Sequence, residues 1–267
     1  MFKNFHPATN FIYFVLGFAA VFTAGSMIFY LPALIILIIF NIMLDRARRL
    51  KSNLIFFIIV AAAMFILNPL FSHRGQIILF YLFGNPVTLE SVIMGLERAL
   101  SLLCLLILFS AFNLIINQDK FLYLFSRFAR QTAFVIMLSV RFLPLLRRRI
   151  TEISHVSRLS GVKGIRKRME NGMNIILTLI TWSLEDAVTT AQSMRARGYG
   201  LKNKRTFYFA YKFKPRDFIF ISFEVILFAA FLFFGSIIFF MFLLALPIVL
   251  EIINYLKWGL YDARNRI

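Results

Sequence analysis

Residues 11–44, FIYFVLGFAAVFTAGSMIFYLPALIILIIFNIML, form one uncharged and mostly apolar run. A helix of about 20 apolar residues already crosses the hydrocarbon core of a bilayer, so this run is too long for one ordinary span. Thr23, Gly25 and Ser26 lie near its middle and offer a place to turn. We therefore predict two membrane helices joined by a tight hairpin. A retained first span is favoured, and a cleavable signal peptide is the alternative.

The rest of the chain has the same character. Hydrophobic residues make up 60% of its 267 residues, well above the soluble norm. Apolar runs at 53–71 and 89–116 predict two more spans. A second double-length run, 217–255, has Gly235 and Ser236 at its centre. Because helices satisfy their own backbone groups in lipid, we predict an all-α, polytopic membrane helical bundle of about six spans. The Gly/Asn/Pro-rich connection at 72–88 is expected to fold back into the interface.

Charge predicts the orientation of the bundle. The chain carries 30 Lys and Arg against 12 Asp and Glu, and an excess of basic residues marks cytoplasmic loops. The basic loop at 45–52, the insert at 141–216 and the tail all fall on one side under this rule. The insert alone holds 17 Lys and Arg and four acidic residues. Both termini are therefore expected in the cytoplasm, and this reading is favoured over nucleic-acid binding.

These patterns divide the chain into three predicted regions. Residues 1–131 form an N-terminal membrane bundle of four spans plus an amphipathic surface helix at 118–131. Residues 132–216 form a basic cytoplasmic region whose first helix starts against the bundle. Residues 217–267 form a C-terminal membrane hairpin and basic tail. Within the fourth span, Glu97 and Arg98 are either functional buried charges or a satisfied structural pair.

A helix is predicted from about Leu184 to Arg197. Ser183 and Asp186 resemble an N-terminal capping box, and Gly198 suits the C-terminal cap. Helical phase places Arg195 at the end of an apolar stripe, where its stem can pack. The stripe consists of Leu184, Ala187, Val188, Ala191 and Arg195. The opposite face carries Asp186, Thr190, Ser193 and Arg197. For Arg197 two interpretations stay open: a solvated cation, or a group that docks in an acidic groove of another protein.

Residues with reactive chemistry are sparse. His6, His73 and His155 lie far apart, and Cys104 is the one cysteine. The sequence has no HExxH motif, and GVKGIRKR (161–168) lacks the order of a phosphate-binding loop. We expect no catalytic, cofactor-binding or metal-ligating residue in this chain, which is therefore not an enzyme.

Four segments together carry a family resemblance: FHPATN (5–10), GQIILFYLFGNPVTLESVIMGLERALSLL (75–103), SVRFLPLLRRRITEI (139–153) and SLEDAVTTAQSMRARGYG (183–200). The chain resembles the transmembrane T component of energy-coupling factor transporters, which import vitamins and metal ions and include cobalt and biotin systems. The element Ala196-Arg197-Gly198 is the most specific part of the likeness, which covers nearly the whole chain.

The resemblance implies a non-catalytic scaffold in a prokaryotic plasma membrane. Its partners would be two ABC-type ATPases that bind ATP and Mg, a small substrate-binding membrane S component, and membrane lipid, but no nucleic acid. Two long, crossed coupling helices would each end in an Arg-centred tripeptide seated in an ATPase groove. ATP-driven motion of the ATPases would pass through these helices to the S component.

The family motifs transfer residue by residue. Ala196-Arg197-Gly198 matches the second tripeptide, and Arg141 to Pro144 match the Arg-Phe-aliphatic-Pro stretch that opens the first coupling helix. Arg141, Pro144 and Arg195 are thus expected to support the coupling helices. The first tripeptide would be centred on Arg158, although its neighbours Ser157 and Leu159 depart from the usual Ala-Arg-Gly or Ala-Arg-Ser. Asn10 stands where the family usually has Lys.

Two other functions stay open. A stand-alone carrier or pore would need polar groups spread through several spans, whereas spans one, two, three, five and six carry almost none, with Glu224 and Glu251 expected near the span ends. A membrane-tethered binder of anionic lipid or nucleic acid would use the basic insert, and its binding would fall steeply with salt.

Overall fold

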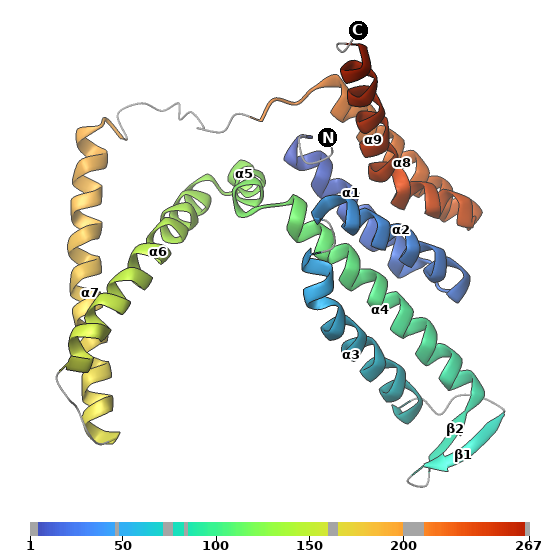
Figure 1. Cartoon of the computed structure of the whole chain (residues 1–267), viewed down its shortest axis with the longest axis horizontal. Helices are drawn as coiled ribbons and strands as arrows, with labels where there is room; N and C mark the ends of the chain where they lie inside the picture. Colours follow the sequence, from blue (N-terminus) through green and yellow to red (C-terminus); the bar gives the residue numbers. More distant parts are fainter. Residues whose placement is uncertain are drawn as a thin grey trace. The chain divides into compact units, whose positions relative to one another are not determined.

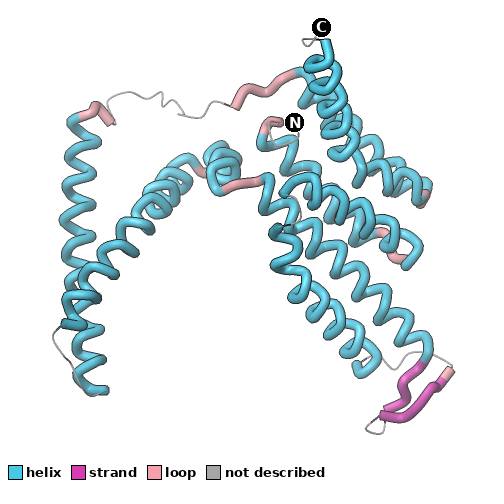
Figure 2. Tube along the Cα trace, in the orientation of Figure 1, coloured by secondary structure: helices cyan, strands magenta, loops and turns pink. Residues whose placement is uncertain are grey.

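The computed structural model describes residues 5–45, 48–71, 77–82, 85–159, 165–199 and 211–264. The chain forms two compact units, one made of Met1–Phe121 with Tyr211–Ile267 and the other of Leu122–Ala210. We call them the bundle unit and the hairpin unit. Helices dominate both (Figures 1 and 2), as predicted.

The bundle unit contains six long helices. They are α1 (Pro7–Thr23), α2 (Met27–Asp45), α3 (Arg48–Phe71), α4 (Leu89–Ile115), α8 (Pro215–Phe234) and α9 (Ile237–Arg264). Both predicted helical hairpins are confirmed. Gly25 lies between α1 and α2 with φ 62°, and Gly235 lies between α8 and α9 with φ 57°. These left-handed backbone angles reverse the chain at little steric cost only where the residue is glycine.

Four of the described helices are long and apolar enough to cross a membrane: Met27–Leu44, Lys51–Phe71, Leu89–Ile115 and Pro215–Phe234. Two further apolar helices, Pro7–Thr23 and Ile237–Ile253, are shorter. The chain is therefore a multi-pass membrane protein. The count of six spans stays a prediction, and so does the cytoplasmic position of both termini.

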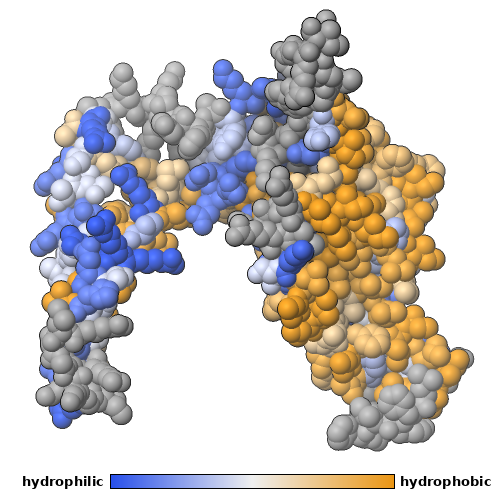
Figure 3. Space-filling view, viewed as in Figure 1, coloured by the Kyte–Doolittle hydropathy of each residue, from blue (hydrophilic) through white to orange (hydrophobic). Residues whose placement is uncertain are grey.

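The core of the bundle unit is apolar and tightly packed. Its largest fully buried side chains include Tyr13, Phe14, Leu108 and Phe240. Helices α3 and α4 approach closely at Gly95, where a Cβ would lie 3.1 Å from the Phe65 carbonyl oxygen. Large apolar side chains also cover the outer surface of the unit (Figure 3), as expected for a surface that faces lipid.

A β-hairpin joins α3 to α4. Strand β1 (Ile78–Leu82) pairs antiparallel with β2 (Asn85–Thr88), and Leu82 lies opposite Asn85. This β-hairpin lies next to the N-terminal end of α4 in Figures 1 and 2. These strands were not predicted, because the Gly, Asn and Pro residues around the turn obscured the short β-favouring segment ILFYL.

The hairpin unit consists mainly of α6 (Arg130–Leu159) and α7 (Ile165–Ala196), which pack on each other and run in opposite directions (Figure 1). The amphipathic α5 (Gln118–Phe128) precedes them, confirming the helix predicted there. The predicted start of a helix at Leu184 is wrong, because α7 begins at Ile165. Ser183 lies inside α7, and its hydroxyl donates to the Ile180 carbonyl at 2.9 Å. An interior serine can satisfy its hydroxyl in this way without ending the helix.

Candidate docking site

The C-terminal end of α7 is closed by a Schellman motif. Gly198 N–H donates to the Arg195 carbonyl, and Tyr199 N–H donates to the Met194 carbonyl, both at 2.9 Å. Gly198 has φ 80°, the left-handed conformation that this motif requires. The predicted glycine cap is confirmed, and it fixes the backbone direction of Arg197, the residue before it.

The Arg197 side chain is exposed, and it forms no ion pair with any residue in the described part of the chain. Its backbone N–H donates to the Ser193 carbonyl at 3.1 Å, which continues the helical hydrogen bonding. Arg195 is exposed as well. A guanidinium held at a fixed helix end is available to bind a carboxylate in a bidentate manner.

An aromatic contact anchors this end of α7 to α6. The rings of Phe134 and Tyr199 are stacked, with centroids 5.1 Å apart and an interplanar angle of 20°. Such a pair adds about 0.5–1.5 kcal/mol to the free energy gained from burial. Because Tyr199 directly follows the cap, the stack holds the Arg197 segment against the start of α6.

Between the two helices lies a mostly apolar depression lined by Leu138, Phe142, Ala187, Thr190, Ala191, Met194, Arg195 and Tyr199. The predicted apolar stripe of α7 is only partly the packing face, since Ala187, Ala191 and Arg195 line the depression. Leu184 and Val188 are 62% and 57% exposed, whereas Thr190, assigned to the polar face, lines the depression. Hydropathy alone does not reveal which members of the stripe line the depression and which stay exposed.

An exposed apolar stripe therefore remains on α7. Its members recur every three or four residues and are 51% to 62% exposed: Met173, Ile176, Leu177, Ile180, Leu184 and Val188. Exposed apolar patches of this kind mark interaction surfaces. Sequence reasoning began this helix at Leu184 and so missed its first half, although the same 3.6-residue period continues upstream.

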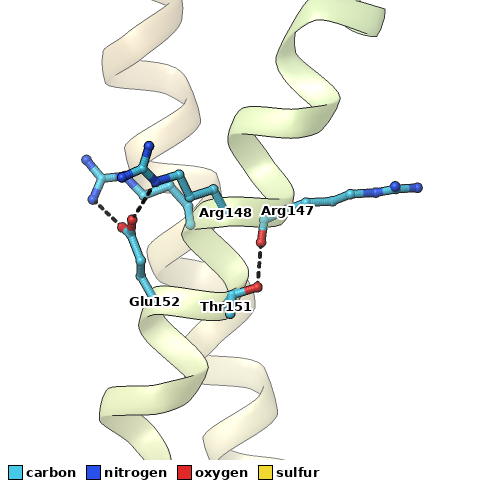
Figure 4. Close-up of polar contacts among 5 residues, drawn as sticks. Arg147, Arg148, Thr151 and Glu152 are labelled. Atoms are coloured by element: carbon cyan, nitrogen blue, oxygen red, sulfur yellow. Dashed lines mark hydrogen bonds and ion pairs between the residues drawn. The ribbon is translucent and has the colours of Figure 1, made fainter.

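Further along, the arginine cluster of α6 is partly neutralised within its own helix. Arg148 Nε and Arg149 Nη1 lie 3.1 Å and 3.0 Å from the carboxylate oxygens of Glu152 (Figure 4). The Arg147 side chain points away from this group, while its carbonyl accepts from Thr151 at 2.9 Å. The Arg149 guanidinium also lies 5.0 Å from the centre of the Trp182 ring on α7, a cation–π contact that joins the two helices.

The remaining predicted support residues lie on α6. Arg141 is exposed on this helix. Pro144 lies inside α6 and cannot donate to the Val140 carbonyl, which weakens the helical hydrogen bonding there. Neither residue contacts Arg195 in a hydrogen bond or ion pair that the described residues reveal.

Arg158 lies at the penultimate position of α6, and its side chain, with Ser160 and Gly161, falls outside the described residues. The Arg149–Trp182 contact sets the alignment of the antiparallel helices. Arg158 follows Arg149 by nine residues, and Arg197 follows Trp182 by 15. At 1.5 Å per residue, the two arginines are separated by roughly 35 Å along the helices. The structure thus places them at opposite ends of α6 and α7.

The FHPATN segment has a structural role in the bundle unit. His6 Nδ1 accepts from Ala8 N–H at 3.2 Å and caps α1. The backbone N–H of His6 and of Lys214 donate to the two carboxylate oxygens of Asp217, at 3.3 Å and 2.8 Å. One buried aspartate therefore ties the start of α1 to the start of α8.

Glu97 and Arg98 are satisfied separately, which favours the structural interpretation. Glu97 Oε1 accepts from Met27 N–H at the start of α2 at 3.3 Å, and Arg98 Nη1 donates to Asn68 Oδ1 on α3 at 2.8 Å. The two side chains link α4 to both neighbouring helices.

The described side chains that could bind a metal or react with oxidants do not form a cluster. Among the described residues no group of three or more His, Cys, Asp and Glu side chains could hold a metal ion. Cys104 is buried in α4 with its thiol 3.6 Å from the Tyr30 carbonyl oxygen. His73 lies outside the described residues.

Comparison with known proteins identifies a family. The family model for CbiQ, described as cobalt transport protein, matches residues 4–208, which include α6, α7 and the arginine at the end of each. No curated protein matches the chain. The matched segment covers most of the sequence, so the chain belongs to the CbiQ family of membrane transport components, the T-component family of energy-coupling factor transporters.

Proposed function

We propose that this chain is the coupling subunit of an energy-coupling factor importer, which passes the motion of two ABC-type ATPases to a substrate-binding S component. The observation that carries the proposal is Arg197. It is exposed, unpaired among the described residues and held at a rigid helix end by the Schellman motif. A solvated cation would not need an aromatic stack beside it, whereas a docking group benefits from a fixed position.

Arg197 would enter an acidic groove on one ATPase, and Arg158 a groove on the other. Arg158 and Arg197 lie about 35 Å apart along the helices. Because one groove that receives a single arginine does not extend that far, this separation favours two ATPases over one. ATP and Mg would be bound by the ATPases. This chain would contribute no nucleotide ligand.

The apolar stripe of α7 would contact the S component. Because α6 leaves this stripe uncovered, its apolar surface would be exposed to water, which is unfavourable in free energy. A partner helix with an apolar face would bury the stripe. The transported substrate, a metal ion such as cobalt or a vitamin, would then be held by the S component.

Coupling requires that the ATPases contact this chain differently in their two states. ATP binding shifts the ATPases between two states, and the shift reaches this chain only if the two states contact α6 and α7 differently. The contacts made by Phe134, Trp182 and Arg149 would let α6 and α7 move together when the arginine ends are displaced.

Charge reversal at Arg197 tests the proposal. In the assembled complex, we expect Arg197→Glu to weaken ATPase association at least tenfold and to abolish uptake, as for the loss of one buried charge pair. Arg197→Lys should also impair docking, because an ammonium does not bind bidentately. Arg147→Glu is the matched control: it reverses an exposed charge whose side chain points away from the Glu152 group. Normal copurification and uptake by the Arg197→Glu complex would exclude the docking role.

A further inference from the structure

A group of buried polar side chains lies inside the bundle unit, away from the docking site. Thr9 and Asn10 on α1 and Glu224 on α8 are each 0% exposed. The Thr9 hydroxyl, both amide atoms of Asn10 and both carboxylate oxygens of Glu224 have no hydrogen-bond partner among the described residues. Glu224 also lies in the middle of α8, not near its end as predicted. An unpaired carboxylate at such a place is strongly unfavourable and marks a functional site.

Helix packing brings these groups to one level of the bundle. The contacts of His6 with Asp217 and of Phe5 with Phe220 align the starts of α1 and α8 in the same direction. Tyr13 and Glu224, both 0% exposed, each lie seven residues further along their helix. Thr9 and Asn10 precede Tyr13 by about one turn on the same buried face. All three unpartnered side chains therefore lie within about one helical turn, ~5 Å along the axis.

Glu224 occupies a position that otherwise holds apolar side chains. The buried face of α8 consists of Asp217, Phe220, Glu224, Leu227 and Phe231. Asp217 accepts two backbone hydrogen bonds, whereas Glu224 accepts none and forms no ion pair with a described Lys, Arg or His. Packing alone would favour Leu or Phe at this position.

Two other buried polar groups of the bundle unit donate to backbone carbonyls. The Tyr13 hydroxyl donates to the Leu244 carbonyl at 3.2 Å. The Asn41 amide on α2 donates to the carbonyls of Leu37 and Ile107, both at 3.1 Å, and its own oxygen is unpartnered. The unpartnered atoms of Thr9, Asn10 and Glu224 are four oxygens and the Asn10 amide nitrogen, and oxygens are the ligands that hard cations prefer.

We propose that Glu224, Asn10 and Thr9 bind one monovalent alkali cation inside the bundle. The carboxylate would neutralise its charge, and the amide and hydroxyl oxygens would complete the ligand set. A divalent ion would leave a net positive charge in a low-dielectric site, which is unfavourable. A proton on Glu224 would need only one acceptor and would leave the other side chains unpartnered. The site is independent of the proposed coupling role.

Thermal unfolding of the full chain in lipid nanodiscs tests this site. Midpoints are compared in NaCl, KCl and N-methyl-D-glucamine chloride at constant ionic strength and pH. A cation that binds only the folded state should raise the midpoint saturably, by about 2–5 °C. Glu224→Gln should remove this dependence. Glu185→Gln, at an exposed carboxylate of α7, should keep it.

A second variant covers the case in which Glu224→Gln does not fold. Thr9→Val removes one oxygen ligand without changing charge or size, and should shift the half-saturating cation concentration upward by roughly tenfold. Equal midpoints of the wild type in all three chlorides would overturn the proposal. So would a midpoint that responds to pH and not to any alkali cation, or stabilisation by CoCl₂ alone, because the carboxyl would then be protonated or occupied by a divalent ion.

Discussion

Gly198 carries the strictest local requirement of the docking site. Its φ of 80° lies in the left-handed region, where a Cβ costs about 1–2 kcal/mol. The sequence alone predicted this position, because a glycine after a helical pattern is the usual C-terminal signal. It also separated Arg195 from Arg197 by helical phase. The unpartnered state of Glu224, in contrast, depends on side chains from other helices, which local sequence does not reveal.

Two glycine substitutions on one helix should have opposite effects. Gly198→Ala should lower the free energy of unfolding by about 1 kcal/mol and weaken ATPase association, because the backbone at Arg197 would change. Gly172 lies inside α7 with nothing within 4 Å of an added Cβ. Gly172→Ala should therefore raise the free energy of unfolding by about 0.5–1 kcal/mol. Denaturant titrations of both variants provide the measurement, and equal effects would contradict a left-handed Gly198.

At the scale of elements, the two helical hairpins were predictable because Gly25 and Gly235 interrupt runs too long for one span. The boundaries of α7 were not. Ser183 and Asp186 are residue types that often cap the N-terminus of a helix, yet the residues before them also favour a helix. Only the hydrogen bond from the Ser183 hydroxyl to the Ile180 carbonyl shows that the helix continues through Ser183. The packing face of α7 was only partly predictable: Ala187 and Ala191 of the predicted stripe line the depression beside α6, whereas Leu184 and Val188 stay exposed.

The aromatic stack between α6 and α7 has a testable cost. Phe134→Ala should lower the free energy of unfolding by about 1–3 kcal/mol, since it removes the stack as well as partly buried surface. It should also reduce uptake by releasing the segment that carries Arg197. Phe134→Tyr keeps the ring and is the control. If Phe134→Ala lowered stability but left ATPase association unchanged, the stack would be structural and unrelated to docking.

At the scale of the whole molecule, the chain combines a membrane bundle with a basic unit that lacks nucleotide-binding motifs. Family membership accounts for both parts, whereas sequence patterns alone left a carrier, a pore and an anion binder open. In the proposed function, the substrate would be held by another chain, so its identity is not encoded in these residues.

Transport by the isolated chain separates these functions. Reconstituted alone into vesicles, the chain should import no cobalt above the level of empty vesicles, because it would lack both the ATPases and the S component. The complete complex with ATP should import substrate. Cobalt uptake by the chain alone would instead favour a carrier or pore. Anionic-lipid binding that falls steeply with salt and tolerates Arg197→Lys would favour the third function.

The position of Trp182 beneath Arg149 has a practical consequence. The chain has two tryptophans, Trp182 and Trp258, so Trp258→Phe leaves a single intrinsic fluorophore at the contact between α6 and α7. We expect its emission to respond to the Arg149 guanidinium, which lies 5.0 Å from the centre of its ring. Stopped-flow fluorescence would then show whether this contact persists while α6 and α7 move together during one ATP cycle, with no attached dye.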